Sequence, residues 1–206
     1  MGRHAVIFDI DGTLLHSAGV DDAIYRQAVR TVLGDVHLRP TLHDYEHITD
    51  TGILSHIFAD NNVSAADDLV DAVRSAFVDL LIAHVERHGP FAEMPGANDM
   101  LSSLRESPEH AVALATGGWR QSAELKLRSV GIDFSGIPLA TSNDHHERTA
   151  IMEIALSRLG SGFDSITYFG DGPWDRDACL ALGWGFVAVG PELGGLEHFK
   201  DMTLCR

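Results

Sequence analysis

The chain has 206 residues, 45% of them hydrophobic, which is enough for one substantial core and a smaller second lobe. Its 30 acidic residues outnumber 15 basic ones, and the resulting net charge of −15 disfavours nucleic acid polymers and anionic membrane surfaces as partners. No apolar stretch is long enough to span a bilayer, and the first strand-like run begins at Ala5, which leaves no room for a signal peptide.

The two cysteines, Cys179 and Cys205, lack the spacing of a zinc site or of a disulfide framework. This cysteine usage favours a reducing compartment. We therefore expect a soluble, cytoplasmic protein, and the sequence is compatible with either a monomer or a homodimer.

Short apolar runs rich in valine, isoleucine and phenylalanine alternate with helical patterns along the chain. The strand-like runs cover residues 5–8, 111–115, 166–169 and 186–189, with a weaker run at 137–140. Between two of them, residues 149–159 place Ile151, Ile154 and Ala155 on one helical face before Gly160 ends the pattern. The alternation predicts an α/β fold with a parallel sheet between helices.

About a hundred residues separate the first two strand-like runs, far more than one crossover helix requires. Helical patterns cover residues 21–33 and 64–88, each followed by a glycine, and residues 42–58 also fit a helix. We therefore expect a small helical cap domain at residues 19–91. Residues 1–18 and 92–206 would then form the core domain.

Polar side chains follow several of the predicted strands. Asp9 and Asp11 follow the first strand, Thr116 follows the second, and Asp171 and Asp175 follow the run at 166–169. Ligands of an open parallel sheet bind beyond the carboxyl ends of its strands, so we expect these groups to converge there. Converging carboxylates repel one another unless a cation lies among them, and their hard oxygens favour Mg²⁺. The sequence thus predicts a magnesium site suited to phosphoryl chemistry.

The same segments resemble, in the same order, the four motifs of the haloacid dehalogenase superfamily. The motif-like segments are Asp9-Ile10-Asp11-Gly12-Thr13, Thr116-Gly117, a downstream basic residue, and Gly170-Asp171-Gly172-Pro173-Trp174-Asp175. The helical insertion after the first motif is similar to the small cap of phosphoglycolate phosphatase-like and β-phosphoglucomutase-like members. The resemblance implies a Rossmann-like core and a cap that closes over a small phosphorylated metabolite.

The resemblance also implies roles for individual residues. Asp9 would be the nucleophile that forms an aspartyl-phosphate, and Asp11 would be the general acid and base. Thr116 and Gly117 would bind the transferring phosphoryl group. Asp9, the backbone carbonyl of Asp11, and Asp171 would hold Mg²⁺, while Asp175 would bind it through water or orient its ligands.

The third motif departs from the family pattern, which usually has a lysine. No lysine follows Ser142 at the expected place, but Arg148 begins a predicted helix there and could grip phosphate while keeping the charge. We assign the role to Arg148, with Lys126 as the alternative. In the cap, we hypothesise that Thr49 and Asp50 lie in a short polar stretch that faces the substrate.

The favoured function is therefore a magnesium-dependent phosphatase that hydrolyses a small phosphate monoester. A β-phosphoglucomutase-like phosphomutase is the first alternative, because it would keep every core residue. A non-catalytic module that binds a phosphorylated metabolite is the second alternative. A haloacid dehalogenase is the least favoured, because typical dehalogenases lack an aspartate at the position of Asp11.

Other interpretations remain open for some of these residues. Asp175 could simply cap the helix that follows it. The pairs His43 with His47 and His145 with His146 could bind a metal, although solvated or isolated histidines explain them as well. Trp119 and Trp174 could either border the substrate or pack in the core.

Overall fold

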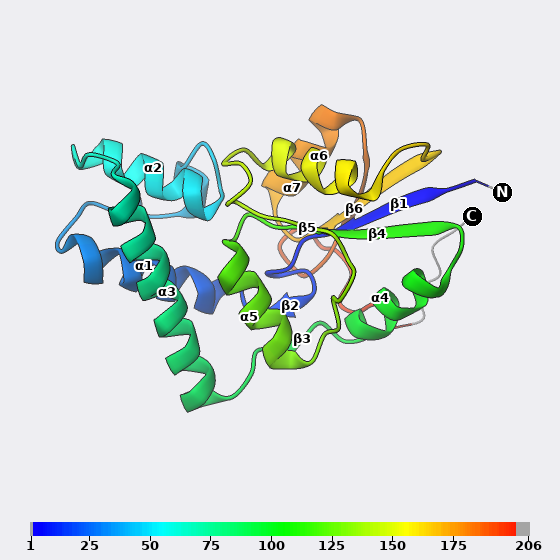
Figure 1. Ribbon diagram of the computed structural model, residues 1–206, viewed down its shortest axis with the longest axis horizontal. Coiled ribbons are helices and arrows are strands. Elements are labelled where there is room, and N and C mark those ends of the chain that lie inside the picture. Colours follow the sequence, from blue (N-terminus) through cyan, green and yellow to red (C-terminus); the bar gives the residue numbers. More distant parts are fainter. Residues whose placement is uncertain (1, 201–206) are drawn as a thin grey trace.

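The computed structural model describes residues 2–200 (Figure 1). Its elements in chain order are β1 (His4–Phe8), β2 (Leu15–His16), α1 (Ala18–Leu33), the 3₁₀ helix η1 (Leu42–Asp44), α2 (Asp50–Asp60), α3 (Asp67–His88), β3 (Ala92–Glu93), α4 (Ala97–Glu106), β4 (His110–Ala115), α5 (Arg120–Val130), β5 (Leu139–Ala140), α6 (Arg148–Leu159), β6 (Ser165–Gly170), α7 (Pro173–Leu182) and β7 (Gly185–Ala188). None of these helices is long and apolar enough to cross a membrane. Cys179 is buried, and Cys205 lies outside the described residues.

Five strands form a parallel sheet in the order β5-β4-β1-β6-β7. The central strand β1 pairs with β4 on one side and with β6 on the other, so that Phe8 lies opposite both Leu114 and Phe169. Each expected strand is present, with its bounds moved by one or two residues. The predicted α/β fold is therefore confirmed.

Helices cover both faces of this sheet. In Figure 1, α6 and α7 lie on one face, and α4 and α5 lie on the other. Side chains of β1 alternate between the two layers: Val6 and Phe8 join the cluster that includes α4 and α5, and Ile7 joins the cluster that includes α6 and α7. Burial on both faces explains why the strands appear in the sequence as unbroken apolar runs.

The helices α1, α2 and α3 form a separate group at one end of the molecule (Figure 1). They share a hydrophobic cluster built around Tyr25, Phe58 and Phe77, to which Trp119 contributes from the start of α5. Helices α1 and α3 match the patterns expected at residues 21–33 and 64–88. We keep residues 19–91 as the proposed cap domain.

The expected helix at residues 42–58 is wrong in its first part. Only η1 and α2 are helical there, and α2 begins at Asp50 because Thr49 has an extended backbone and accepts a hydrogen bond from Gly52 N at 3.1 Å. The polar stretch from Thr49 to Gly52 thus forms the N-cap and first turn of α2. A threonine at this position is a common helix N-cap.

A two-stranded antiparallel ladder joins the two ends of the helical insertion. In it, β2 pairs with β3, so that Leu15 lies opposite Glu93 and His16 opposite Ala92. Strands of two residues have no readable periodicity, which is why the sequence gives no sign of them. The ladder places the beginning of α1 beside the segment that follows α3.

Candidate active site

Three adjacent strands bring the predicted catalytic segments to one edge of the sheet. Asp9 follows β1, Thr116 follows β4, and Asp171 follows β6. These residues line a cavity of about 300 Å³ between the sheet edge and the helical insertion. The cavity is also lined by Asp11, Asp21, Asp22, Asp50, Gly117, Gly118, Arg148 and Trp174.

Asp9 is the most enclosed carboxylate beside the cavity that still has a free oxygen. Its side chain is buried, and Oδ1 has no hydrogen-bond partner among residues 2–200. Oδ2 lies 3.5 Å from the guanidinium of Arg148. Burial raises the pKa of Asp9 to about 7; the charge of Arg148 opposes this shift, and the charges of Asp175 and Asp11 add to it.

Arg148 is the first residue of α6, and its guanidinium spans from the core to the helical insertion. One nitrogen lies 3.0 Å from Asp175 Oδ1 and 3.5 Å from Asp9 Oδ2, and the other donates to the carbonyl of Ile48 at 3.1 Å. The structure therefore brings Arg148 to Asp9, as the motif order predicts. Lys126, the alternative candidate, contacts Asp11 and Asp21 instead of Asp9.

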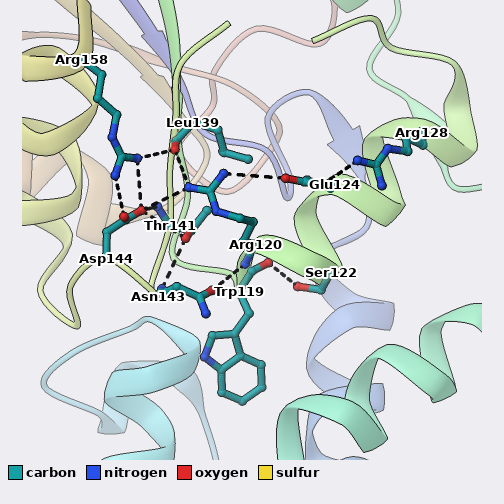
Figure 2. Close-up of polar contacts among 10 residues, drawn as sticks. All are labelled: Trp119, Arg120, Ser122, Glu124, Arg128, Leu139, Thr141, Asn143, Asp144 and Arg158. Atoms are coloured by element: carbon teal, nitrogen blue, oxygen red, sulfur yellow. Dashed lines mark hydrogen bonds and ion pairs between the residues drawn. The ribbon is translucent and has the colours of Figure 1, made fainter. Parts of the chain in front are cut away.

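A polar network holds the loop that leads to Arg148 (Figure 2). Asp144 accepts from Arg158 at 2.6 Å, and Arg120 N donates to Asn143 Oδ1 at 2.8 Å. Arg120 and Arg158 both donate to the carbonyl of Leu139, the first residue of β5. The network ties this loop to α5, β5 and α6, so it fixes where α6 begins and where Arg148 points.

Asp9, Asp171 and Asp175 form a group that could bind a metal ion, because one ligand atom from each lies within 4.8 Å of the others. Burial raises the pKa of Asp171 to about 8, and the charges of Asp9 and Asp175 add to the rise. Gly12 is essential to this arrangement: its φ is 79°, and a Cβ atom there would lie 1.9 Å from Asp171 Oδ2. Crowded, buried carboxylates of this kind are stabilised by a cation.

Asp175 also caps the helix that follows it, which was the alternative interpretation of this residue. Its Oδ2 accepts from Gly172 N at 3.2 Å and so caps α7, while its Oδ1 pairs with Arg148. The side chain is completely buried. The helix cap and the ion pair fix the carboxylate beside Asp9 and Asp171.

The loop after β4 passes very close to Arg148. Thr116 is buried and its hydroxyl accepts from Gly118 N at 3.1 Å. A Cβ atom on Gly117 would lie 2.6 Å from an Arg148 nitrogen and 3.0 Å from the carbonyl of Ile48, so only glycine fits. Thr116, Gly117 and Gly118 all line the cavity.

Asp11 has a different partner from Asp9. Both of its oxygens lie 2.6 Å from Lys126 Nζ, and the hydroxyl of Ser17 donates to Oδ1. Lys126 also lies 2.6 Å from Asp21 Oδ1 on α1. The two aspartates of the first motif therefore face two different cations.

Thr49 and Asp50 line the cavity, but their polar atoms also join the helical insertion to the core. Thr49 donates to the carbonyl of His146 at 2.7 Å, Asp50 N donates to the carbonyl of Gly117 at 2.8 Å, and Asp50 Oδ2 accepts from Trp119 N at 2.7 Å. A direct contact of these two side chains with substrate stays a prediction.

The tryptophans and histidines fall into different surroundings. Trp119 is fully buried, whereas Trp174 borders the cavity and packs near His43, with ring centroids 5.8 Å apart. The rings of His47 and His146 lie 4.9 Å apart, and ligand atoms of both lie near Glu147. His146 and Glu147 are exposed, as expected for solvated side chains.

Lys126 was predicted only as the alternative to Arg148, and its contacts with Asp11 and Asp21 were not predicted. The available signal was its position: Lys126 falls in the buried stripe of α5 with Ser122, Ala123 and Leu127. A lysine on a buried face is rare unless it is paired. That pattern identifies a buried ion pair but does not name its partners.

Comparison with solved structures finds proteins of the same fold. A β-phosphoglucomutase from Clostridium difficile has a TM-score of 0.70 and 16% identity, with 92% of this chain and 85% of that chain covered. CbbY from Rhodobacter sphaeroides in complex with phosphate has a TM-score of 0.69 and 18% identity, with 98% and 90% covered. A hydrolase from Pseudomonas syringae has a TM-score of 0.69 and 19% identity, with 91% and 84% covered.

No curated protein matches this chain. The family model for haloacid dehalogenase-like hydrolases does match it, over residues 4–183. That range contains the sheet edge, the helical insertion and every residue of the site described above. The chain belongs to the haloacid dehalogenase-like hydrolases.

Proposed function

We propose that this protein is a magnesium-dependent phosphatase that hydrolyses a small phosphate monoester through an aspartyl-phosphate on Asp9. The observation that carries the proposal is the Asp9 carboxylate itself. One of its oxygens has no hydrogen-bond partner among the described residues, the other lies beside Arg148, and the side chain lines the cavity. A free carboxylate oxygen beside a fixed cation is what attack on phosphorus requires.

In the first half-reaction, Asp9 attacks the phosphorus atom and Asp11 gives a proton to the departing oxygen. Arg148, the Thr116 hydroxyl and the amide of Gly117 donate to the phosphoryl oxygens. In the second half-reaction, water attacks the phosphorus and gives its proton to Asp11, which frees Asp9 and inorganic phosphate. Asp11 therefore alternates between acid and base.

Asp9, Asp171 and the backbone carbonyl of Asp11 would hold the Mg²⁺ ion, with Asp175 fixed beside them by Arg148 and Gly172. The donor set consists of hard oxygens, which suits Mg²⁺. The fit is supported by the close grouping of the Asp9, Asp171 and Asp175 carboxylates and by the raised pKa values of Asp9 and Asp171. When bound, the ion neutralises the carboxylates and the phosphate oxygens together.

The leaving-group side of the cavity favours neutral alcohols over anions. Asp21, Asp22 and Asp50 line it, and among the described lining residues Arg148 is the only arginine or lysine. Its guanidinium already pairs with Asp9 and Asp175. A second phosphate or a carboxylate on the substrate would therefore lie against carboxylates, with no arginine or lysine among the described lining residues free to pair with it.

The test is phosphate release from a metabolite panel that contains size-matched neutral and anionic leaving groups. We expect Mg²⁺-dependent turnover, and kcat/KM at least about tenfold higher for glycerol 1-phosphate than for 2-phosphoglycolate. Asp9→Asn is the control that removes the nucleophile and keeps the shape. Absence of phosphate release from every ester would contradict the phosphatase proposal, and a preference for 2-phosphoglycolate would contradict only the assignment of the leaving group.

A phosphomutase is the second candidate, because a β-phosphoglucomutase shares this fold. The two reactions differ in what accepts the phosphoryl group from Asp9: water in a phosphatase and a sugar hydroxyl in a mutase. Isomerisation of a sugar phosphate faster than release of inorganic phosphate would favour the mutase. Chloride release from haloacids would instead support a dehalogenase, and phosphate-ester binding without turnover would support a binding module.

A further inference from the structure

Lys126 is a fully buried lysine that the phosphatase mechanism above does not use. It is one of two lysines in the chain, the other being Lys200, which is exposed. Lys126 lies on the buried face of α5 and is not itself one of the residues that line the cavity. A buried ammonium group is retained only where carboxylates and hydrogen bonds compensate for the lost water.

All three N–H groups of the Lys126 ammonium can be assigned to carboxylate oxygens. Nζ lies 2.6 Å from Asp11 Oδ1, 2.6 Å from Asp11 Oδ2 and 2.6 Å from Asp21 Oδ1. Burial alone would lower the pKa of Lys126, but the charges of Asp11 and Asp21 outweigh burial and raise it. The side chain is thus a fixed cation that has no donor left for a substrate.

The three partners come from three different parts of the chain. Asp11 follows β1 in the catalytic loop, Lys126 belongs to α5, and Asp21 lies in the first turn of α1 at the start of the proposed cap. Ser17, between the loop and α1, donates to Asp11 as well. The orientation of the Asp11 carboxylate therefore depends on where α1 lies relative to α5.

We propose that Lys126 is a positioning residue that fixes the Asp11 carboxylate for proton transfer to the leaving oxygen, with Asp21 holding Lys126 in place from the cap. This inference rests on the proposed phosphatase function. Lys126 acts through Asp11 and not on the phosphate, because Arg148 occupies the side of Asp9 and Lys126 is closed off from the cavity. Loss of Lys126 should then matter most where the leaving group needs a proton.

The experiment compares kcat for aryl phosphates of similar size whose leaving groups differ in basicity. Phenyl phosphate releases a basic phenolate that needs a proton, whereas p-nitrophenyl phosphate releases an anion that needs little help. We expect Lys126→Met to lower kcat about 100-fold or more on phenyl phosphate and less than about tenfold on p-nitrophenyl phosphate. Lys200→Met is the matched control, with both rates unchanged.

Two further variants keep the test decisive if Lys126→Met folds poorly. Asp21→Asn leaves Lys126 paired with Asp11 but weakens the contact of Lys126 with the cap. The loss of kcat should therefore again be larger on phenyl phosphate than on p-nitrophenyl phosphate. In an Asp11→Asn background, Lys126→Met should change neither rate further, because the group it positions is gone. Circular dichroism of each variant confirms the fold.

Equal losses on the two esters, or no loss on either, would overturn the positioning role and identify a purely structural ion pair. A further loss in the Asp11→Asn background would do the same. Failure of the phosphatase proposal looks different, because the wild-type protein would then release no phosphate from either aryl ester or from the metabolite panel.

Discussion

The two aspartates of the first motif are two residues apart, yet they lie in contrasting surroundings. On the side of the proposed nucleophile, one oxygen of Asp9 has no hydrogen-bond partner among residues 2–200, and the other lies 3.5 Å from Arg148. On the acid-base side, both oxygens of Asp11 are held by Lys126 at 2.6 Å. A carboxylate that must attack needs a free oxygen, and one that must exchange a proton needs a fixed orientation. The surroundings of the two carboxylates therefore differ in the way that the two proposed roles require.

Replacement of Arg148, the partner of Asp9, should have the largest effect on both stability and activity. Arg148→Ala leaves Asp9 and Asp175 buried without a counter-charge, so we expect a loss of about 3–5 kcal/mol in the free energy of unfolding. We also expect kcat to fall at least about 100-fold. In the proposed mechanism Arg148 binds the phosphoryl group and not the leaving group, so the loss of kcat should be the same for phenyl and p-nitrophenyl phosphate, in contrast with Lys126→Met.

Arg148→Lys is the matched variant, because it keeps the charge and loses the forked geometry. It should recover most of the stability and only part of the rate, as measured by urea unfolding and steady-state kinetics. If Arg148→Ala lowered kcat on phenyl phosphate but not on p-nitrophenyl phosphate, the proposed difference between the surroundings of Asp9 and those of Asp11 would be contradicted.

Removal of the divalent ion should change the stability contributed by Asp9 and Asp171, and not the stability contributed by the pairing of Asp11 with Lys126. An acid whose pKa is raised by folding lowers stability as pH rises from its unfolded value, about 4, to its folded value. For Asp9 and Asp171 the folded values are about 7 and about 8. The metal-free protein should therefore lose stability between pH 4 and pH 8, and a bound cation offsets that loss.

Thermal unfolding with and without Mg²⁺ measures this effect. At a fixed Mg²⁺ concentration of about 100 times the Kd at pH 8, we expect about 2.7 kcal/mol of stabilisation at that pH, or a rise in Tm of roughly 5–10 °C, and a smaller rise at pH 5.5. The rise should persist in Lys126→Met and disappear in Asp171→Asn. A rise of equal size at both pH values would contradict the role of the buried carboxylates.

The smallest effect is expected for the polar network that holds the loop leading to Arg148. Burial raises the pKa of Asp144, but the hydrogen bonds from Arg158 and from Thr141 N outweigh burial and lower it. Asp144→Asn should therefore destabilise the protein by about 1 kcal/mol at neutral pH, and kcat should fall less than in Arg148→Ala.

The pH dependence gives the sign of the Asp144 contribution. A lowered pKa stabilises the fold above the unfolded value of about 4, and that stability is lost as pH falls through the folded value. Urea unfolding of the wild type and of Asp144→Asn should thus differ at pH 7 and converge near pH 3. A difference that grew at low pH would show that the network acts in another way.

The sequence was most informative where chemistry and local pattern coincide. The apolar run before Asp9, and the polar residues Thr116 and Asp171 after two other runs, predict a sheet edge that the structure contains. Arg148 could be found because it begins a helix at the expected place. The pairing of Lys126 with Asp11 spans 115 positions, and no local pattern encodes a contact of that range.

The irregular parts of the helical insertion were predicted less well. Residues 42–58 have enough apolar positions for a helix, but the N-cap at Thr49 delays α2 until Asp50. The short strands β2 and β3 are set by tertiary pairing and not by their own composition. Such features depend on contacts formed only after folding.

Detection of the phosphorylated enzyme is the most direct test of the central claim. The protein is mixed with p-nitrophenyl phosphate and Mg²⁺, quenched in acid within milliseconds, and digested for mass spectrometry. We predict one added phosphoryl group on the peptide that contains Asp9, carried by Asp9 itself and absent from Asp9→Asn. Turnover in which Asp9 is never phosphorylated, or undiminished turnover by Asp9→Asn, would contradict the claim.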